Sequence, residues 1–228
     1  MILHFFATYG YYGFLAVGAV SMLVLTLLRR KLYDLSILLA ICFPIALLLC
    51  GVSGAKLLFF VESGFSSFSG MSFFGAVFLV LVLMPPLGLL IKLKPSQTLD
   101  ACAPCVASII AFMRFGCFCA GCCGGILCTV GQSSFRWPTQ LIEGLGDILI
   151  LAMLLFIEKK GSKKGLLYPI FLVSYGTMRF AIEFVRDTPK HMLGCSEGQW
   201  LSLLAVLIAV IWILLHRGVQ VKQERKVQ

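Results

Sequence analysis

The chain has 228 residues, of which 60% are hydrophobic and only 13% are charged, with a mean hydropathy of +0.98. Such an apolar composition excludes an ordinary soluble domain, and it makes the net charge of +9 poor evidence for nucleic-acid binding. We therefore predict an all-α, polytopic membrane protein that forms one transmembrane domain over residues 1–228.

Seven apolar runs are long enough to cross a hydrocarbon core about 30 Å thick, which needs about 20 helical residues. They lie at residues 10–28, 35–58, 71–91, 99–120, 140–157, 166–185 and 199–216. The N-terminal residues show neither a basic segment nor a small-residue cleavage site. We therefore expect no removable signal peptide, and the first span should remain as an anchor.

Basic residues are distributed unevenly between the loops. Thirteen of the 19 Lys and Arg residues follow the first, third, fifth and seventh spans, whereas the opposite loops hold three. Because basic residues are retained on the cytoplasmic side of short loops, the N-terminus should lie outside and the C-terminus inside. Residues 217–228 would then form a short basic cytoplasmic tail, and anionic lipid headgroups are the expected contacts of the positive charge.

Charged residues also occur inside the sixth predicted span. Tyr175, Arg179, Glu183 and Arg186 follow one another at spacings of three and four residues, which places them on one helix face. An arginine at the centre of a membrane-spanning helix costs roughly 2.5 to 3.5 kcal/mol, so residues of this kind usually have a function. This face should look inward onto a polar cavity.

Other spans contribute polar residues at a similar depth. Lys56 closes the second span, Arg114 lies late in the fourth, and Gln140 and Glu143 open the fifth. All of these positions fall in the outer half of the predicted membrane, which favours one shared site near the outer leaflet. The alternative is that Arg179 and Glu183 only neutralise each other, while Lys56 and Glu143 extend to the interface.

The end of the fourth span is rich in glycine and cysteine, from Arg114 to Gly125. The glycines disfavour a regular helix and permit an unwound turn whose amides could face an anionic group. The C-x-C-x-x-C-C spacing that begins at Cys117 could ligate a metal, but no second cysteine or histidine cluster matches it, so no metal is assigned. Two readings stay open for the cysteines: simple packing, or a disulfide that involves Cys122, Cys123, Cys128 or Cys195.

Several short motifs recur in order along the spans. They are Tyr9-Gly10, Arg29-Arg30, Gly54-Ala55-Lys56, Gly70-Met71-Ser72-Phe73, Asp100 to Pro104, Arg114 to Phe118, Trp137 to Glu143, Tyr175-Gly176 with Arg179, Glu183-Phe184 and Arg186, and Gly198-Gln199. Each motif is weak alone. Their order and spacing over nearly the whole chain resemble those of the prolipoprotein diacylglyceryl transferases of bacterial inner membranes.

The resemblance implies a multi-pass transferase of the bacterial inner membrane, active at the outer leaflet. It would move the diacylglyceryl group of phosphatidylglycerol to the cysteine thiol of a lipoprotein precursor and release glycerol phosphate, without a metal or soluble cofactor. Arg114 and Arg179 match the family's two principal arginines, and a guanidinium suits phosphate binding because it stays charged and donates in a planar fork. Both would also stabilise the charge of the leaving group.

The resemblance extends to the neighbours of these arginines. Glu183 would orient Arg179, and Tyr175 would donate a hydrogen bond to the headgroup. Gln140 and Glu143 would line the same cavity, with Arg186 at its outer rim.

The chain departs from the family pattern at several of these positions. Phe74 stands where family members generally have a histidine, and a phenyl ring cannot accept a proton. Cys117 replaces an asparagine, and Lys56 replaces an arginine, which keeps the charge but loses the planar fork. Phe74 should face the cavity, and Glu143, Cys117 or solvent would have to deprotonate the acceptor thiol.

Two classes of function therefore remain open. The retained residues Arg114, Glu143, Arg179 and Glu183 favour a divergent transferase, or a paralogue with another acceptor. The missing histidine favours a non-catalytic member that binds a lipid headgroup or a partner protein.

Overall fold

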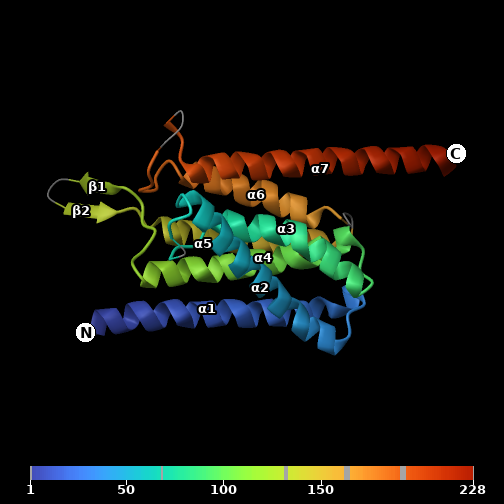
Figure 1. The fold of residues 1–228 in the computed structure, drawn as a ribbon, viewed down its shortest axis with the longest axis horizontal. Helices are drawn as coiled ribbons and strands as arrows, with labels where there is room; N and C mark the ends of the chain where they lie inside the picture. The colour runs from blue at the N-terminus through green and yellow to red at the C-terminus, as the bar shows by residue number, and fades with distance from the viewer. Residues whose placement is uncertain (1, 68, 131–132, 162–164, 191–193, 228) are drawn as a thin grey trace.

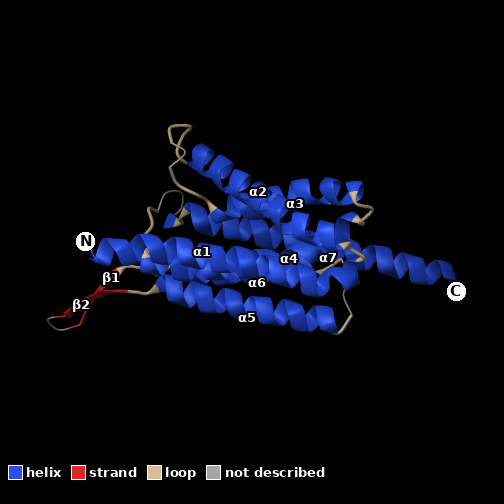
Figure 2. Ribbon diagram, turned by 90° about the horizontal axis from the view of Figure 1, so that it is seen from below, coloured by secondary structure: helices blue, strands red, loops and turns tan. Residues whose placement is uncertain are grey.

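A computed structural model describes residues 2–67, 69–130, 133–161, 165–190 and 194–227. These residues form an elongated bundle of α-helices with a small β-hairpin projecting from one end (Figures 1 and 2). The helices are α1 (Ile2–Arg29), α2 (Ile37–Glu62), α3 (Phe73–Leu90), α4 (Pro95–Cys119), α5 (Thr139–Lys159), α6 (Leu167–Ile182) and α7 (Glu197–Val227). A short 3-10 turn, η1 (Arg30–Tyr33), follows α1, and strands β1 (Leu127–Val130) and β2 (Ser133–Arg136) pair antiparallel.

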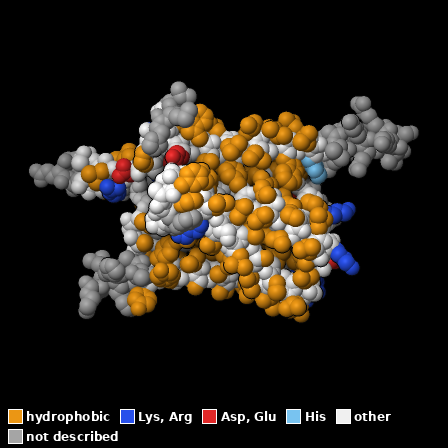
Figure 3. Space-filling view, viewed as in Figure 1, with side chains coloured by type: hydrophobic (Ala, Val, Ile, Leu, Met, Phe, Trp, Pro, Cys, Tyr) orange, Lys and Arg blue, Asp and Glu red, His pale blue; other side chains and the backbone are white. Residues whose placement is uncertain are grey.

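The prediction of an all-α polytopic membrane protein is confirmed. Six of the described helices are long and apolar enough to cross a membrane, and the seventh predicted span corresponds to the shorter apolar helix α6. Hydrophobic side chains cover much of the face of the bundle that Figure 3 shows. The sequence did not predict the hairpin, whose strands have four residues each.

Several predicted boundaries were wrong. Helix α6 ends at Ile182 instead of continuing to residue 185, because the chain turns there and pairs with the segment after α4. The amide of Ile126 donates to the Val185 carbonyl at 2.9 Å, and Gly125 bridges to Arg186. Glu183 and Arg186 therefore lie just beyond the helix instead of inside it.

Two other helices are longer than predicted. Helix α2 continues to Glu62, so Lys56 lies within the helix and does not close it. Helix α7 continues through most of the predicted tail to Val227. Hydropathy locates the membrane-crossing part of a helix, but it does not locate the residue at which the backbone hydrogen bonds end.

Helix α4 occupies the centre of the bundle and packs against α1, α3, α5 and α6. Its buried face is built largely from small side chains, including Ala103, Cys105 and Ala107. Small residues let helix backbones approach one another closely in a membrane. The same device joins α2 to α3, where a Cβ atom at Gly54 would collide with the Gly75 carbonyl.

The hairpin and the N-terminus lie at one end of the bundle, and the C-terminus extends from the other (Figure 1). The connections after α1, α3 and α5 lie at the C-terminal end, as alternating spans require. These are the loops that carry most of the basic residues, although Lys163 and Lys164 lie outside the described residues. The side of the membrane that each end faces stays a prediction.

Candidate functional site

A cavity of about 310 Å³ lies at the hairpin end of the bundle. The end of α2, the start of α3, the late part of α4, the end of α6 and the start of α7 form its walls. Its charged lining residues are Glu62, Arg114, Arg179, Glu183, Arg186 and Glu197. Phe59, Phe73, Phe74 and Leu201 supply an apolar wall. The cavity can therefore hold a molecule that has both a charged and an apolar part.

Glu143 of α5 is the centre of an ion-pair network beside this cavity. Its Oε1 atom accepts hydrogen bonds from Nη1 of Arg179 at 2.9 Å and Nη1 of Arg186 at 3.1 Å. Its Oε2 atom lies 2.6 Å from Nε of Arg114. The Glu143 side chain is fully buried, and burial of a charge is tolerated only when it is paired in this way.

A second carboxylate completes the network at the C-terminal end of α6. Oε2 of Glu183 lies 3.0 Å from Nη2 of Arg179 and 3.8 Å from Nε of Arg186, and its Oε1 accepts a hydrogen bond from the Thr188 hydroxyl at 2.8 Å. Three guanidinium groups thus face two glutamates. The three guanidinium groups are the donors that an anionic ligand such as a phosphate would use, although Glu62 and Glu197 line the same cavity and leave its wall without an excess of positive charge.

Several buried polar atoms of the network have no hydrogen-bond partner among the described residues. They include Nη2 of Arg114, the hydroxyl of Tyr175 and both carboxylate oxygens of Asp147. An unsatisfied buried polar group costs about 1 to 3 kcal/mol, so a ligand that pairs with it gains binding energy. Arg114 is also a lining residue of the cavity, so a ligand bound there lies next to this guanidinium group.

Two aromatic residues at the start of α3 flank Arg114. The Phe73 ring lies 4.3 Å from the Arg114 guanidinium carbon, which is a cation–π contact that holds the arginine against the cavity wall. Phe74 is buried, lines the same cavity as Arg114 and Arg179, and packs against the Tyr175 ring at 5.7 Å. Phe74 was expected to face the same cavity as Arg114 and Arg179, and the structure places it among the residues that line this cavity.

The chain's relatives identify the family to which this site belongs. A sequence model of prolipoprotein diacylglyceryl transferase matches residues 2–215. The chain belongs to the prolipoprotein diacylglyceryl transferase family. The resemblance noted from the motifs is therefore confirmed.

Individual members of the family match parts of the chain. A phosphatidylglycerol–prolipoprotein diacylglyceryl transferase of Clostridium tetani is 32% identical over 127 residues, which cover 50% of this chain and 51% of the relative. Proteins of the same name from Idiomarina loihiensis and Cupriavidus necator are 31% and 33% identical, over 68% and 63% of this chain. These matches span 61% and 59% of the two relatives.

Not every residue that the family pattern predicted for the site lines the cavity. Gln140 is buried beside it, where its Nε2 atom donates to the Cys122 carbonyl at 2.6 Å. Lys56 is half-buried on α2 and is not among the lining residues, because α2 continues beyond it. Cys117 is buried behind the wall, and the cysteine that lines the cavity is Cys123.

Tyr175 and Glu143 are not among the lining residues: Glu143 pairs with Arg114, Arg179 and Arg186, which line the cavity, and Tyr175 packs against the lining residue Phe74. Sequence reasoning missed Asp147, which follows Glu143 by four residues on α5 and is equally buried. The spacing of four is the signal that could have identified it, because it places both carboxylates on one helix face.

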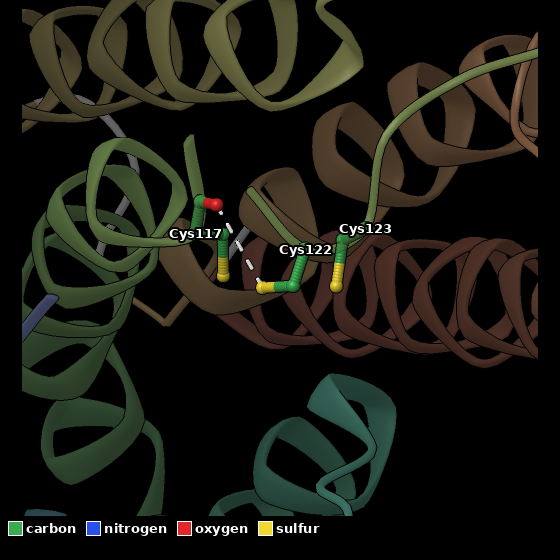
Figure 4. A group of neighbouring side chains, drawn as sticks. All are labelled: Cys117, Cys122 and Cys123. Carbon is green, nitrogen blue, oxygen red and sulfur yellow. Dashed lines mark hydrogen bonds between the residues drawn. The ribbon is translucent and has the colours of Figure 1, made fainter. Parts of the chain in front are cut away.

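The turn after α4 brings three cysteines together near the cavity. The sulfur atoms of Cys117, Cys122 and Cys123 all lie within 4.8 Å of one another, and Figure 4 shows them in a row with Cys122 in the middle. A hydrogen bond with the Cys117 thiol, supported by the nearby charges of Arg186 and Arg114, lowers the pKa of Cys123 to about 5. Cys128 and Cys195 are free thiols, so the structure forms none of the disulfides considered for them.

Proposed function

We propose that the protein transfers the diacylglyceryl group of phosphatidylglycerol to the cysteine thiol of a lipoprotein precursor, at the outer leaflet of a bacterial inner membrane. Family membership supports this reaction, and so do the names of the relatives. The observation that carries the proposal is the convergence of Arg114, Arg179 and Arg186 on one cavity that lies beside apolar side chains.

The substrate headgroup would bind among the three arginines. Phosphate accepts hydrogen bonds from guanidinium groups in a bidentate manner, and Nη2 of Arg114 is a buried donor that lacks a partner within the described part of the chain. The cavity volume of about 310 Å³ lies at the lower end of the range for small-molecule sites. It suits a headgroup, while the acyl chains would extend along the apolar surface of the helices.

The reaction is a substitution at carbon. The acceptor sulfur, as a thiolate, forms a bond to the glyceryl CH₂ carbon, and the bond from that carbon to the phosphate oxygen breaks. The bonding electron pair leaves with the oxygen, so the products are a thioether and glycerol phosphate. Arg114 and Arg179 would stabilise the negative charge that develops on this oxygen.

Glu183 and Glu143 are positioning residues in this scheme. Glu143 holds the guanidinium groups from behind the lining residues and Glu183 holds Arg179 from the cavity wall, so the donors are oriented before the substrate arrives. Because Glu143 already contacts Arg114, Arg179 and Arg186, it is poorly placed to act as the base for the acceptor thiol.

The test uses purified protein in phosphatidylglycerol vesicles with a peptide that carries the lipoprotein-precursor cysteine. We expect release of glycerol phosphate together with a mass gain of one diacylglyceryl group on the peptide, and neither product with a Cys-to-Ser peptide. Arg114→Lys and Arg179→Lys should retain only a remnant of this activity, because lysine cannot form the bidentate contact. Wild-type turnover by a double lysine variant would contradict the assigned roles.

A further inference from the structure

We propose that Cys117, Cys122 and Cys123 form a three-thiolate site for a thiophilic divalent cation such as Zn²⁺, with the fourth coordination position open toward the cavity. The metal site itself is independent of the proposed function. The role of its open position in ionising the acceptor thiol rests on that function.

The spacing of the sulfur atoms fits a tetrahedral cation. Zinc binds thiolate sulfur at about 2.3 Å, so two sulfurs of one tetrahedron lie about 3.8 Å apart. The three sulfurs observed lie within 4.8 Å of one another, so rotation of the side chains can close the remaining gap. Figure 4 shows the Cys122 side chain pointing toward Cys117, with Cys123 next to it.

The backbone of this turn is folded so that the thiols converge. After α4 ends, Gly121 and Cys123 adopt left-handed conformations with φ of 68° and 61°. The amide of Cys122 donates to the Cys117 carbonyl at 3.2 Å, which folds the chain back over the end of α4. A left-handed conformation costs a cysteine roughly 1 to 2 kcal/mol, and such strain is found mainly at functional sites.

The start of α5 fixes the same turn from the other side. Gln140 donates to the Cys122 carbonyl at 2.6 Å, and the Thr139 hydroxyl donates to the Cys123 carbonyl at 3.1 Å. These bonds hold the carbonyl oxygens, Cys122 and Cys123 remain exposed residues, and the Cys122 thiol donates to the Cys117 carbonyl at 3.7 Å. Gln140, which was expected to line the cavity, is thus a positioning residue for this site.

The electrostatic surroundings suit a thiolate-bound cation. A divalent cation with three thiolates has a net charge of −1, and Cys123 lines the cavity together with Arg114, Arg179 and Arg186. Three protein ligands with one open position are typical of catalytic zinc sites, whereas structural sites have four protein ligands.

The open position offers the acceptor thiol a means of ionisation that Phe74 cannot provide. A thiol that binds the cation loses its proton to solvent, because metal-bound sulfur is deprotonated. Its sulfur then forms the bond to the glyceryl carbon, and the electron pair of the broken carbon–oxygen bond leaves with the phosphate. The cation keeps its three protein ligands and its charge, so no oxidant or reductant is required.

Cobalt(II) is the probe for the site, because it occupies zinc sites and its bond to thiolate absorbs in the near ultraviolet. We expect purified, reduced, metal-free protein in detergent to bind one Co²⁺ per chain with this absorption. Cys122→Ser and Cys123→Ser should each lose the band. Cys119→Ser is the matched control and should keep it, because Cys119 lies in the same segment but outside the sulfur cluster.

Retention of the band in a Cys122→Ser/Cys123→Ser double variant would overturn the proposal. A disulfide among the three cysteines in protein purified without reductant would also overturn it, as mass spectrometry of alkylated peptides would show. Addition of the precursor peptide should shift the cobalt spectrum, whereas its Cys-to-Ser version should not, and no shift with either would overturn the open position. Cobalt bound through these cysteines without glycerol phosphate release would support the metal site and count against the transferase.

Discussion

The two ends of the bundle each contain an arginine paired with a glutamate, partly buried at the C-terminal end and fully buried at the hairpin end, and the two pairs differ in how completely they are satisfied. At the C-terminal end, Arg29 donates to both carboxylate oxygens of Glu158 and to the carbonyls of Asp100 and Ala101. The Tyr33 hydroxyl donates to the same glutamate at 2.5 Å. At the hairpin end, Arg114 reaches Glu143 at 2.6 Å but leaves Nη2 without a partner among the described residues.

This difference separates a structural cluster from a binding site. Arg29 joins α1 to α4 and α5, and the nearby Asp100 carboxylate accepts hydrogen bonds from the amides of Gly165 and Leu167, which fixes the start of α6. No donor of Arg29 is left for a ligand. At the hairpin end Arg114 lines a cavity and has a donor without a partner among the described residues, so a bound ligand can supply the missing acceptor.

The largest effect is expected from removal of the arginines at the hairpin end. Arg114→Ala and Arg179→Ala should each lower the rate of glycerol phosphate release by at least about 10²–10³-fold, because each removes a donor to the leaving charge. The protein should still fold, since Glu143 keeps two arginine partners in either variant. A variant that folds and retains full turnover would place its arginine outside the reaction.

Removal of Arg29 should lower the stability of the protein and leave its turnover unchanged. Arg29→Ala leaves the partly buried Glu158 without its main partner, and the loss of stability should approach the cost of about 3 to 5 kcal/mol that is typical of a fully buried pair. We expect a lower unfolding temperature in detergent, and unchanged turnover per folded molecule. Arg136→Ala is the control, because its partner Asp187 is exposed and such pairs contribute about 0–1 kcal/mol. Equal losses of stability in both variants would contradict the structural assignment of Arg29.

A smaller change is expected at Phe74. Phe74→His places a proton acceptor on the cavity wall beside Tyr175, and we expect turnover to rise by up to about 10²-fold, the lower end of the range for general-base help. The measurement is the same release assay at several pH values. Full family-level turnover by the unmodified chain would show that Phe74 does not mark a divergence. Binding of phosphatidylglycerol without turnover in either protein would favour a non-catalytic role.

The sequence predicted the helices well because a membrane imposes a minimum length of apolar helix. It did not predict the end of α6, because that end depends on pairing between Gly125 and Arg186, which are far apart in the sequence. The hairpin was missed for a related reason, since its short strands lie between two apolar spans and have no strong pattern.

Part of the site was predictable as well. Equal depth on three helices correctly indicated that Arg114, Glu143 and Arg179 would meet. The convergence of the cysteines was not predictable, because it depends on the left-handed backbone of Gly121 and Cys123. The spacing of the cysteines was compatible with a metal, but no second cluster of cysteine or histidine in the sequence supported one.

The central claim is that the network at the hairpin end is completed by an anionic phosphate headgroup. The most direct test is the unfolding temperature of the purified protein in detergent, with and without added phosphatidylglycerol, since a ligand of the folded state stabilises it. We expect phosphatidylglycerol to raise the unfolding temperature of the wild type and of Arg29→Lys, but not of Arg114→Lys, and we expect zwitterionic phosphatidylethanolamine to have little effect. Equal stabilisation of the wild type and Arg114→Lys by phosphatidylglycerol would contradict the account.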